Sequence, residues 1–426
     1  MAAERHYDIV VIGAGLAGLA GVIALRDAGL SVAVVDNIAK IDGSRMNWGH
    51  DLQPNALAAL ESLGLLDRVR ELGAWHDAYQ LEKLGGGPLS HWDYSMLDHR
   101  HPYAVCIRTH VLRELLREAT RELDFVDLHI PATYTGLERT EGGHAVTIET
   151  GEGATERVHG RLVVAADGPR SRVREAAGIR ARFKRGKRHW LDVIMDNPGD
   201  RIKDGYVYFG RGEYLGIVPT RPGELVAFHL TSTPNLDAYK QMIGGIDGFR
   251  ARYAEMAPIL AEPAQSVDSF DRTSHTLGHS MRAETWVDDG LLLLGDSGVT
   301  VNPITSSGAG LALEEGVAFG EVVSECFAKG DLSAAALAPY EERCRPRAEK
   351  MQDMGDTCTF VFGSRLPVVN GLKLRMLSRI DRDPAMKHRI LAYFSGMEPD
   401  PIGYRDGLAA AGLWPRGRRP AASMPA

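Results

Sequence analysis

The sequence predicts an α/β fold built on a dinucleotide-binding βαβ unit, with a second, strand-rich domain inserted into it and helices at the C-terminus. Three observations predict this architecture. Residues 8–36 read as strand, glycine-rich turn, helix, strand and acid. Two later apolar strands end in an Asp-Gly turn at 167–168 and a Gly-Asp turn at 295–296. Between these two turns lies a long stretch dominated by strand patterns.

The βαβ unit opens with an apolar run, Ile9 to Ile12, which is short enough for a buried parallel strand. Gly13, Gly15 and Gly18 follow at G-x-G-x-x-G spacing. In this spacing the first glycine makes the tight turn, the second lets the backbone approach a pyrophosphate, and the third lets the helix pack on the strand. We therefore expect the whole turn to contact a cofactor, including the intervening residues Ala14, Leu16 and Ala17.

The end of the unit favours an adenosine ribose without a 2′-phosphate. The helix is expected to end at Ala28-Gly29, and a strand from Ser31 to Val35 ends at Asp36. A carboxylate at this point accepts hydrogen bonds from a ribose diol and disfavours a phosphate. The free N–H groups at the helix N-terminus suit a diphosphate. NAD and FAD both fit this half of the site.

Composition narrows the function classes. Hydrophobic residues make up 44% of the 426 residues, charged residues 25%, and the net charge is −7, so nucleic acid is not an expected partner. We expect no membrane span, since no run of about eighteen apolar residues occurs. The four cysteines lack metal-ligand spacing, so no metal site is predicted, and with no signal peptide a cytoplasmic protein is expected. The basic stretch Arg180 to Arg188 is interpreted as a solvated face or an inter-domain edge.

Changes in sequence character suggest where the domains divide. Aromatic residues, histidines and a triple-glycine turn between Ala74 and Tyr103 predict a hairpin that leaves the first domain, and strands dominate from about Arg180 to Met281. Strands over 125–130, 134–139 and 145–149 are expected to form a β-meander. The predicted division is a discontinuous cofactor domain (1–75, 103–180 and 281–350), a substrate domain (76–102 and 181–280), a C-terminal helical region (351–412) and a disordered tail (413–426).

The two later turns carry further candidate ligand contacts. Asp167, followed by Gly168, can hold a hydroxyl, cap the next helix, or simply make an Asx-turn between strand and helix. Gly295 precedes Asp296, which is placed to bind a ribityl or pyrophosphate hydroxyl. About a dozen residues later Gly308, Ala309 and Gly310 open a long helix, whose free N–H groups would face an electron-rich oxygen such as O2 of a flavin.

Together, the G-x-G-x-x-G, Asp-Gly and Gly-Asp motifs resemble the three fingerprints of the class A flavoprotein monooxygenases, the p-hydroxybenzoate hydroxylase-like family that includes ubiquinone-pathway hydroxylases. The resemblance covers roughly the whole chain. It implies a Rossmann-like FAD-binding domain of the p-hydroxybenzoate hydroxylase type with an inserted α+β substrate domain. It also implies tightly but non-covalently bound FAD, with NADPH or NADH as a transient reductant.

In that family reduced FAD reacts with O2 to a C4a-hydroperoxide, which passes one oxygen atom to an aromatic, polycyclic or quinone-like small molecule. A monomer or homodimer is expected. The likeness assigns Arg45 to the pyrophosphate, Arg108 to the flavin, and Gln53 and Pro303 to the surroundings of the cofactor. The sequence departs from the family in having Asp36-Asn37 in place of Glu-Arg. It also has Gly-Asp-Ser-Gly-Val in place of Gly-Asp-Ala-Ala-His.

The substrate pocket is expected between the strand-rich insertion and the flavin. Candidate lining residues come from the large insertion and from the first one: Tyr206, Tyr208, Arg211, Tyr214, His229, His76 and His91. Aromatic residues that alternate on a strand more often belong to a core, so no catalytic residue is assigned.

Several other functions stay open. A prenyl-lipid (geranylgeranyl) reductase would carry the same fingerprints and reduce double bonds without O2. A flavin-dependent halogenase would share the FAD domain, but the sequence has no Trp-x-Trp-x-Ile-Pro element. A non-enzymatic FAD-binding protein is a third alternative. Within the monooxygenase interpretation, epoxidation and Baeyer–Villiger insertion are further outcomes.

Overall fold

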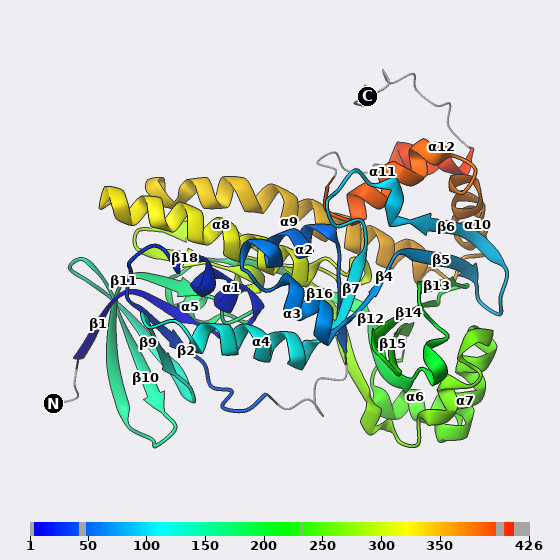
Figure 1. Ribbon diagram of the computed structural model, residues 1–426, viewed down its shortest axis with the longest axis horizontal. Helices are drawn as coiled ribbons and strands as arrows, with labels where there is room; N and C mark the ends of the chain where they lie inside the picture. The colour runs from blue at the N-terminus through cyan, green and yellow to red at the C-terminus, as the bar shows by residue number, and fades with distance from the viewer. Residues whose placement is uncertain (1–3, 42–47, 232, 398–403, 413–426) are drawn as a thin grey trace.

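The computed structural model describes residues 4–41, 48–231, 233–397 and 404–412. The predicted tail, 413–426, lies outside them. Two eight-stranded sheets lie at opposite ends of an elongated molecule (Figure 1). The long helices α8 (Gly308–Lys329) and α9 (Ala334–Phe362) pack side by side along one flank.

The first sheet has the strand order β17-β18-β11-β1-β2-β8, with β10 and β9 added through β11. The bounds are β1 (Glu4–Ile12), β2 (Val32–Val35), β8 (Val126–His129), β9 (Ala132–Thr140), β10 (Gly143–Thr150), β11 (Thr155–Ala165), β17 (Val287–Asp288) and β18 (Leu291–Leu293). Strands β18, β11, β1 and β2 run parallel, so their carboxyl ends share one edge. The turns at Gly13, Asp167 and Gly295 therefore meet at that edge.

One predicted strand arrangement was wrong. Of the expected meander, only the antiparallel pairing of β9 with β10 is found, because β8 pairs in parallel with β2 instead of joining β9; β10 then pairs antiparallel with β11. Pro131 follows β8, and because proline has no N–H to donate, the ladder ends there and the chain turns to start β9.

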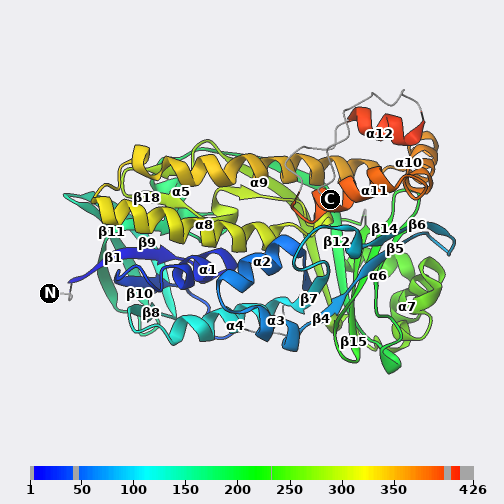
Figure 2. The same cartoon turned by 45° about the horizontal axis from the view of Figure 1, so that its top comes forward.

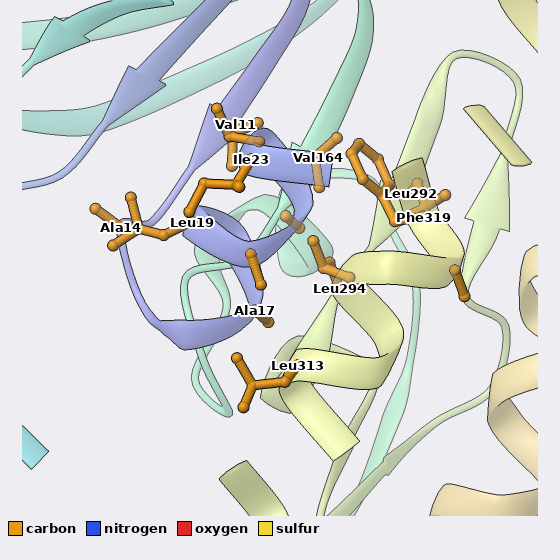
Figure 3. Packing of buried hydrophobic residues seen from close by; sticks show 14 of the residues in the cluster. Val11, Ala14, Ala17, Leu19, Ile23, Val164, Leu292, Leu294, Leu313 and Phe319 are labelled. Atoms are coloured by element: carbon orange, nitrogen blue, oxygen red, sulfur yellow. The ribbon is translucent and has the colours of Figure 1, made fainter. Parts of the chain in front are cut away.

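Helix α1 (Leu16–Ala24) lies between the first sheet and α8. Glycines bring the two helices close, because a Cβ on Gly316 would lie 2.6 Å from the Ala20 Cβ and one on Gly320 would lie 2.4 Å from the Ala24 Cβ. Figure 3 shows the apolar side chains that α1, the sheet and α8 bury together. The helix ends before the predicted Gly29, because residues 25–28 form tighter turns.

The second sheet has the order β19-β16-β12-β15-β14-β13-β5-β6. The bounds are β5 (Ala78–Lys83), β6 (Pro88–Asp93), β12 (Ala181–Asp196), β13 (Gly205–Phe209), β14 (Tyr214–Arg221), β15 (Glu224–Thr231), β16 (Thr273–Ala283) and β19 (Val299–Thr300). Helices α6 (Leu236–Ile243) and α7 (Gly245–Met256) form a buried apolar cluster with one face of this sheet. The opposite face is turned toward the rest of the molecule, as Figures 1 and 2 show.

Smaller elements connect the two sheets and close the chain. Strands β3 (Gly49–Leu52), β7 (Ala104–Arg108) and β4 (Ala74–His76) form a three-stranded sheet. The remaining helices are α2 (Pro54–Ser62), α3 (Leu66–Leu72), α4 (Thr109–Arg121), α5 (Arg172–Ala176), α10 (Pro367–Ile380), α11 (Pro384–Phe394) and α12 (Tyr404–Ala411). The predicted boundary at residue 350 falls inside α9; the domain division as a whole stays a prediction. None of the described helices is both long and apolar enough to cross a membrane.

Candidate active site

A cavity of about 600 Å³ lies between the carboxyl edge of the first sheet and the open face of the second. It is continuous from the glycine-rich turn after β1 to the side chains of β12, β14 and β15. Of the predicted site residues, it is lined by Gly15, Leu16, Ala17, Gly168, Tyr214, Asp296, Pro303, Gly308 and Ala309. Its size is typical of a site for a small molecule or cofactor.

The three glycines of the first turn have different roles. Gly13 has φ +112°, and a Cβ there would lie 2.2 Å from the carbonyl oxygen of Ala166. A Cβ on Gly18 would lie 2.2 Å from the Gly13 carbonyl oxygen, so both glycines are required by packing. A Cβ on Gly15 would meet no atom within 4 Å, and Gly15 lines the cavity. Packing does not require a glycine at position 15, so the space in front of it is open to a ligand.

Asp36 ties this turn to helix α4. One carboxylate oxygen accepts hydrogen bonds from the N–H of Ala14 over 2.7 Å and from Arg113 Nη2 over 3.0 Å, and the other accepts from the N–H of Ile38 over 2.7 Å. A carboxylate has about four acceptor positions, so one is left for a ribose hydroxyl. Arg113 also lines the cavity, and sequence reasoning missed it. The signal in the sequence that could have identified it as a site residue was its position in α4, one turn after Thr109.

The Asp-Gly turn contributes backbone to the cavity. Ala166 and Gly168 line it, whereas the Asp167 carboxylate accepts hydrogen bonds from the N–H groups of Arg172 and Val173 over 2.8 and 3.3 Å. Asp167 thereby caps α5, and burial raises its pKa. Of the interpretations left open by the sequence, this geometry matches the cap on the next helix, while Asp167 Oδ1 is buried without a hydrogen-bond partner among the described residues.

The Gly-Asp turn presents a carboxylate to the cavity. The Asp296 side chain opens into the cavity, and no partner for it occurs among the described residues. The residue is exposed to this cavity, and the protein packed around the cavity walls raises the pKa of the carboxyl to about 6 by desolvation. Next to it, the N-terminal turn of α8 lines the cavity with Gly308 and Ala309, whose N–H groups have no acceptor in the described chain. Gly310 instead faces Asn55 of α2.

Two of the cofactor candidates predicted by family likeness, Arg108 and Gln53, do not line the cavity. Arg45 falls outside the described residues. Arg108 Nη1 donates a hydrogen bond to Glu224 Oε1 over 3.1 Å, which links β7 to β15. Gln53 precedes α2, donates from Nε2 to Asp51 Oδ2 over 2.8 Å and accepts a hydrogen bond from the Tyr94 hydroxyl.

Most predicted pocket residues of the second sheet lie away from the cavity. Tyr206 and Tyr208 pack into the cluster under α6 and α7, and the His229 ring contacts Tyr239 and Tyr253 of those helices. Arg211 is exposed and donates to the Arg365 carbonyl oxygen. Only Tyr214 of this group lines the cavity.

The two predicted histidines of the first insertion also separate. His91 is exposed, and its N–H donates to Asp381. His76 is buried, and its Nε2 lies 2.9 Å from Oδ1 of Asp51, a residue that lines the cavity. His76 thus supports the site through another residue.

Sequence reasoning missed the residues that form the far wall. Trp190 and Asp192 of β12 and Phe228 of β15 line the cavity with Tyr214, and His50 and His279 complete this part. Burial lowers the pKa of His50 to about 4, so its imidazole is neutral at physiological pH. The alternation of Trp190 and Asp192 along a strand was the available signal.

Comparisons with known proteins identify the family. The model of the family described as FAD binding domain matches residues 6–354. A 6-methylpretetramide 4-monooxygenase of Streptomyces rimosus is 30% identical over 354 residues, covering 81% of this chain and 82% of that protein. This chain belongs to the class A FAD-dependent monooxygenases. The predicted family, enzyme class and fold are thereby confirmed.

Two further comparisons place this monooxygenase among its relatives. The p-nitrophenol 4-monooxygenase structure from Pseudomonas putida superimposes with a TM-score of 0.77 at 16% identity, covering 93% of this chain and 99% of that one, which shows the shared fold. A digeranylgeranylglycerophospholipid reductase of Methanothermobacter thermautotrophicus is 26% identical over 351 residues, covering 80% of this chain and 82% of the reductase.

The cavity of the monooxygenase fits the FAD that its family binds. The open space at Gly15 and the N-terminus of α1 suit a pyrophosphate. The remaining acceptor position of Asp36 suits the ribose, and the free N–H groups of Gly308 and Ala309 suit an electron-rich flavin oxygen. When bound there, FAD supplies the redox chemistry, while the protein binds, orients and excludes water.

Proposed function

We propose that this monooxygenase uses NADPH or NADH and O2 to insert one oxygen atom into an aromatic, polycyclic or quinone-like small molecule. The observation that carries the proposal is the continuity of one cavity from the Gly15 turn to a wall of Trp190, Tyr214 and Phe228. Aromatic walls favour a flat ring, because ring faces and edges pack against one another.

The site residues are proposed to have the following roles. Gly15, Leu16 and Ala17 approach the pyrophosphate, Asp36 with Arg113 holds the adenosine ribose, and Asp296 binds a ribityl or pyrophosphate hydroxyl. The N-terminal turn of α8 faces the flavin ring. FAD is proposed to be held non-covalently, with the nicotinamide cofactor as a transient reductant. A cytoplasmic location is proposed because all four cysteines are free thiols and the reductant is an intracellular metabolite.

The test measures NADH and NADPH oxidation in air by the FAD-loaded protein, with a panel of phenols, naphthols, quinolones, polycyclic aromatics and 6-methylpretetramide. Substrate-stimulated oxidation and a product that carries one oxygen atom from isotopically labelled O2 would support the proposal. Gly15→Val protein, treated identically, is the matched control for chemistry that occurs without the cofactor site.

The prenyl-lipid reductase is the second candidate, because a reductase aligns over most of the chain. An anaerobic assay with a geranylgeranyl lipid distinguishes the reductase function from the monooxygenase function. Loss of a double bond without O2, and no oxygen transfer to any member of the aromatic panel, would favour the reductase and overturn the proposal.

A further inference from the structure

Asp192 is a charged residue type in an otherwise apolar stretch of β12. Leu191 and Val193, on either side of it, belong to the buried cluster under α6 and α7, so strand alternation points Asp192 to the opposite face. There it lines the cavity beside Trp190, and the residue is only 7% exposed. Its cross-strand neighbours, Phe228 on β15 and Ser274 on β16, carry no charge.

The Asp192 carboxyl has no partner in the described chain. No hydrogen bond or ion pair to it occurs among the described residues, and burial is the only cause of its raised pKa. Arg113 is the only arginine or lysine among the described lining residues, and it is paired with Asp36. A buried polar group without a partner is costly, so a carboxyl left in this state points to a ligand that completes it.

We propose that Asp192 selects the substrate by hydrogen bonding to a hydroxyl or N–H donor on a neutral aromatic ring. The inference rests on the proposed function and specifies its substrate class. Trp190, Tyr214 and Phe228 would contact the ring, and Asp192 is placed among them to contact the donor substituent. A substrate with a carboxylate at this position would find no described lysine or unpaired arginine in the cavity lining to compensate its charge, so anionic rings are disfavoured.

The protonation state strengthens this selection. Burial raises the pKa of Asp192 to about 8, so the carboxyl is neutral at pH 7 and can accept a hydrogen bond from a phenol while donating one to the phenol oxygen. The titratable groups around it are His50 and Asp51 on β3, Tyr214, His279 and Asp296 in the cavity, and Tyr253 behind the sheet. The lowered pKa of His50, about 4, keeps that ring from supplying a compensating charge at pH 7.

The test uses three probes that differ in one substituent: 2-naphthol, 2-methoxynaphthalene and 2-naphthoate. Each is titrated at pH 7 into the FAD-loaded protein without nicotinamide, and Kd is read from the change in the flavin absorbance spectrum. We expect 2-naphthol to bind roughly fivefold or more tightly than its methyl ether, as for one net hydrogen bond, and 2-naphthoate to bind most weakly.

Two variants assign the preference to Asp192. Asp192→Leu should equalise the Kd values of 2-naphthol and 2-methoxynaphthalene. Asp192→Asn, which keeps an acceptor oxygen and a similar shape, should retain the preference for 2-naphthol. Flavin content and circular dichroism check the fold of each variant. If the leucine variant does not fold, Asp192→Ala, which also removes the acceptor, carries the test with the same expected loss of preference.

Outcomes for this inference and for the proposed function are separable. Equal binding of the naphthol and its ether by the wild type, an unchanged preference in Asp192→Leu, or tight binding of 2-naphthoate would overturn the role of Asp192. None of these results depends on turnover. Oxygen transfer to a panel member, measured separately, would still support the monooxygenase function after such a result.

Discussion

The backbone N–H of Gly295 donates a hydrogen bond to Glu315 Oε2 over 2.8 Å, and this contact joins the Gly-Asp turn to α8. Glu315 is buried one to two turns into the helix whose N-terminal residues line the cavity. The bond therefore fixes two parts of the site, Asp296 and the start of α8, relative to each other.

Glu315 predicts a pH dependence of stability. Burial raises the pKa of Glu315 to about 8, above the usual 4.5 that applies in the unfolded chain. The folded protein then holds a proton that the unfolded chain releases, so this stabilising contribution is complete below about pH 4.5 and is lost as the pH rises through 8. Glu315→Gln, which keeps the acceptor for Gly295, should flatten this decline.

The measurement is the urea unfolding free energy of both proteins, without added FAD, between pH 5.5 and pH 8.5. The unfolding free energy of Glu315→Gln should increase relative to that of the wild type as the pH rises. Glu315→Ala is the contrasting control, because it leaves the Gly295 N–H buried without an acceptor and should lose about 2–4 kcal/mol. If the difference in unfolding free energy between Glu315→Gln and the wild type stays constant across this range, the raised pKa of Glu315 is contradicted.

Gly15→Val should abolish FAD binding without unfolding the protein. The valine side chain would fill the open space at the first turn that we assign to the pyrophosphate, yet it meets no protein atom near its Cβ. We expect purified variant with little bound flavin and a thermal transition close to that of apo wild type. Gly371→Val is the matched control, since that helix position also has open space but lies away from the cavity, and it should keep its flavin.

Asp296→Ala and Asp167→Ala should have different effects, although both acids come from family fingerprints. Asp296 opens into the cavity, so its loss should raise the Kd of FAD roughly tenfold or more and leave the unfolding free energy of apo protein little changed. Asp167 caps α5, so its loss should cost about 1 kcal/mol of stability. Flavin titration and urea unfolding of both variants separate the two roles. An Asp296→Ala protein with wild-type flavin affinity would refute the role that we assign to Asp296.

The sequence predicted the parts of the site that depend on local pattern. The spacing of Gly13, Gly15 and Gly18 encodes a strand–turn–helix unit within a few residues, and the same holds for the Gly-Asp turn before α8. The parallel pairing of β1 with β11 and of β11 with β18 then brings the carboxyl ends of these strands together at one edge.

The far wall could not be predicted in the same way. Tyr206, Tyr208 and His229 have the residue types expected of a substrate pocket, but the face of a strand that becomes core depends on where α6 and α7 pack. That packing is a long-range property, and shifting by one residue exchanges the two faces of a strand. For the same reason the sequence did not predict that Asp192 lines the cavity. It also did not predict the ion pair of Arg113 with Asp36, because these residues lie 77 positions apart in the sequence.

The buried pair of Asp51 and His76 predicts a final stability effect. Burial alone would lower the pKa of His76, but the carboxylate of Asp51 outweighs it, and the pKa is raised. The two ring nitrogens face oxygen acceptors, Asp51 Oδ1 over 2.9 Å and the Ala78 carbonyl over 3.2 Å, as a protonated ring requires. The Tyr79 hydroxyl also donates to Asp51, so the carboxylate organises this edge of the cavity.

Asp51→Asn should therefore destabilise the protein by about 3 kcal/mol at pH 6, because the histidine loses its charge partner while both side chains are buried. The stability supplied by His76 is complete below its ordinary pKa of 6.5 and is lost as the pH rises above its raised value, so the cost of the substitution should shrink at pH 9. Urea unfolding at both pH values measures this difference, with Asp27→Asn, at an exposed ion pair to Arg26, as the control expected to change little. A cost for Asp51→Asn that is equal at pH 6 and pH 9 would mean that His76 is neutral in the folded protein.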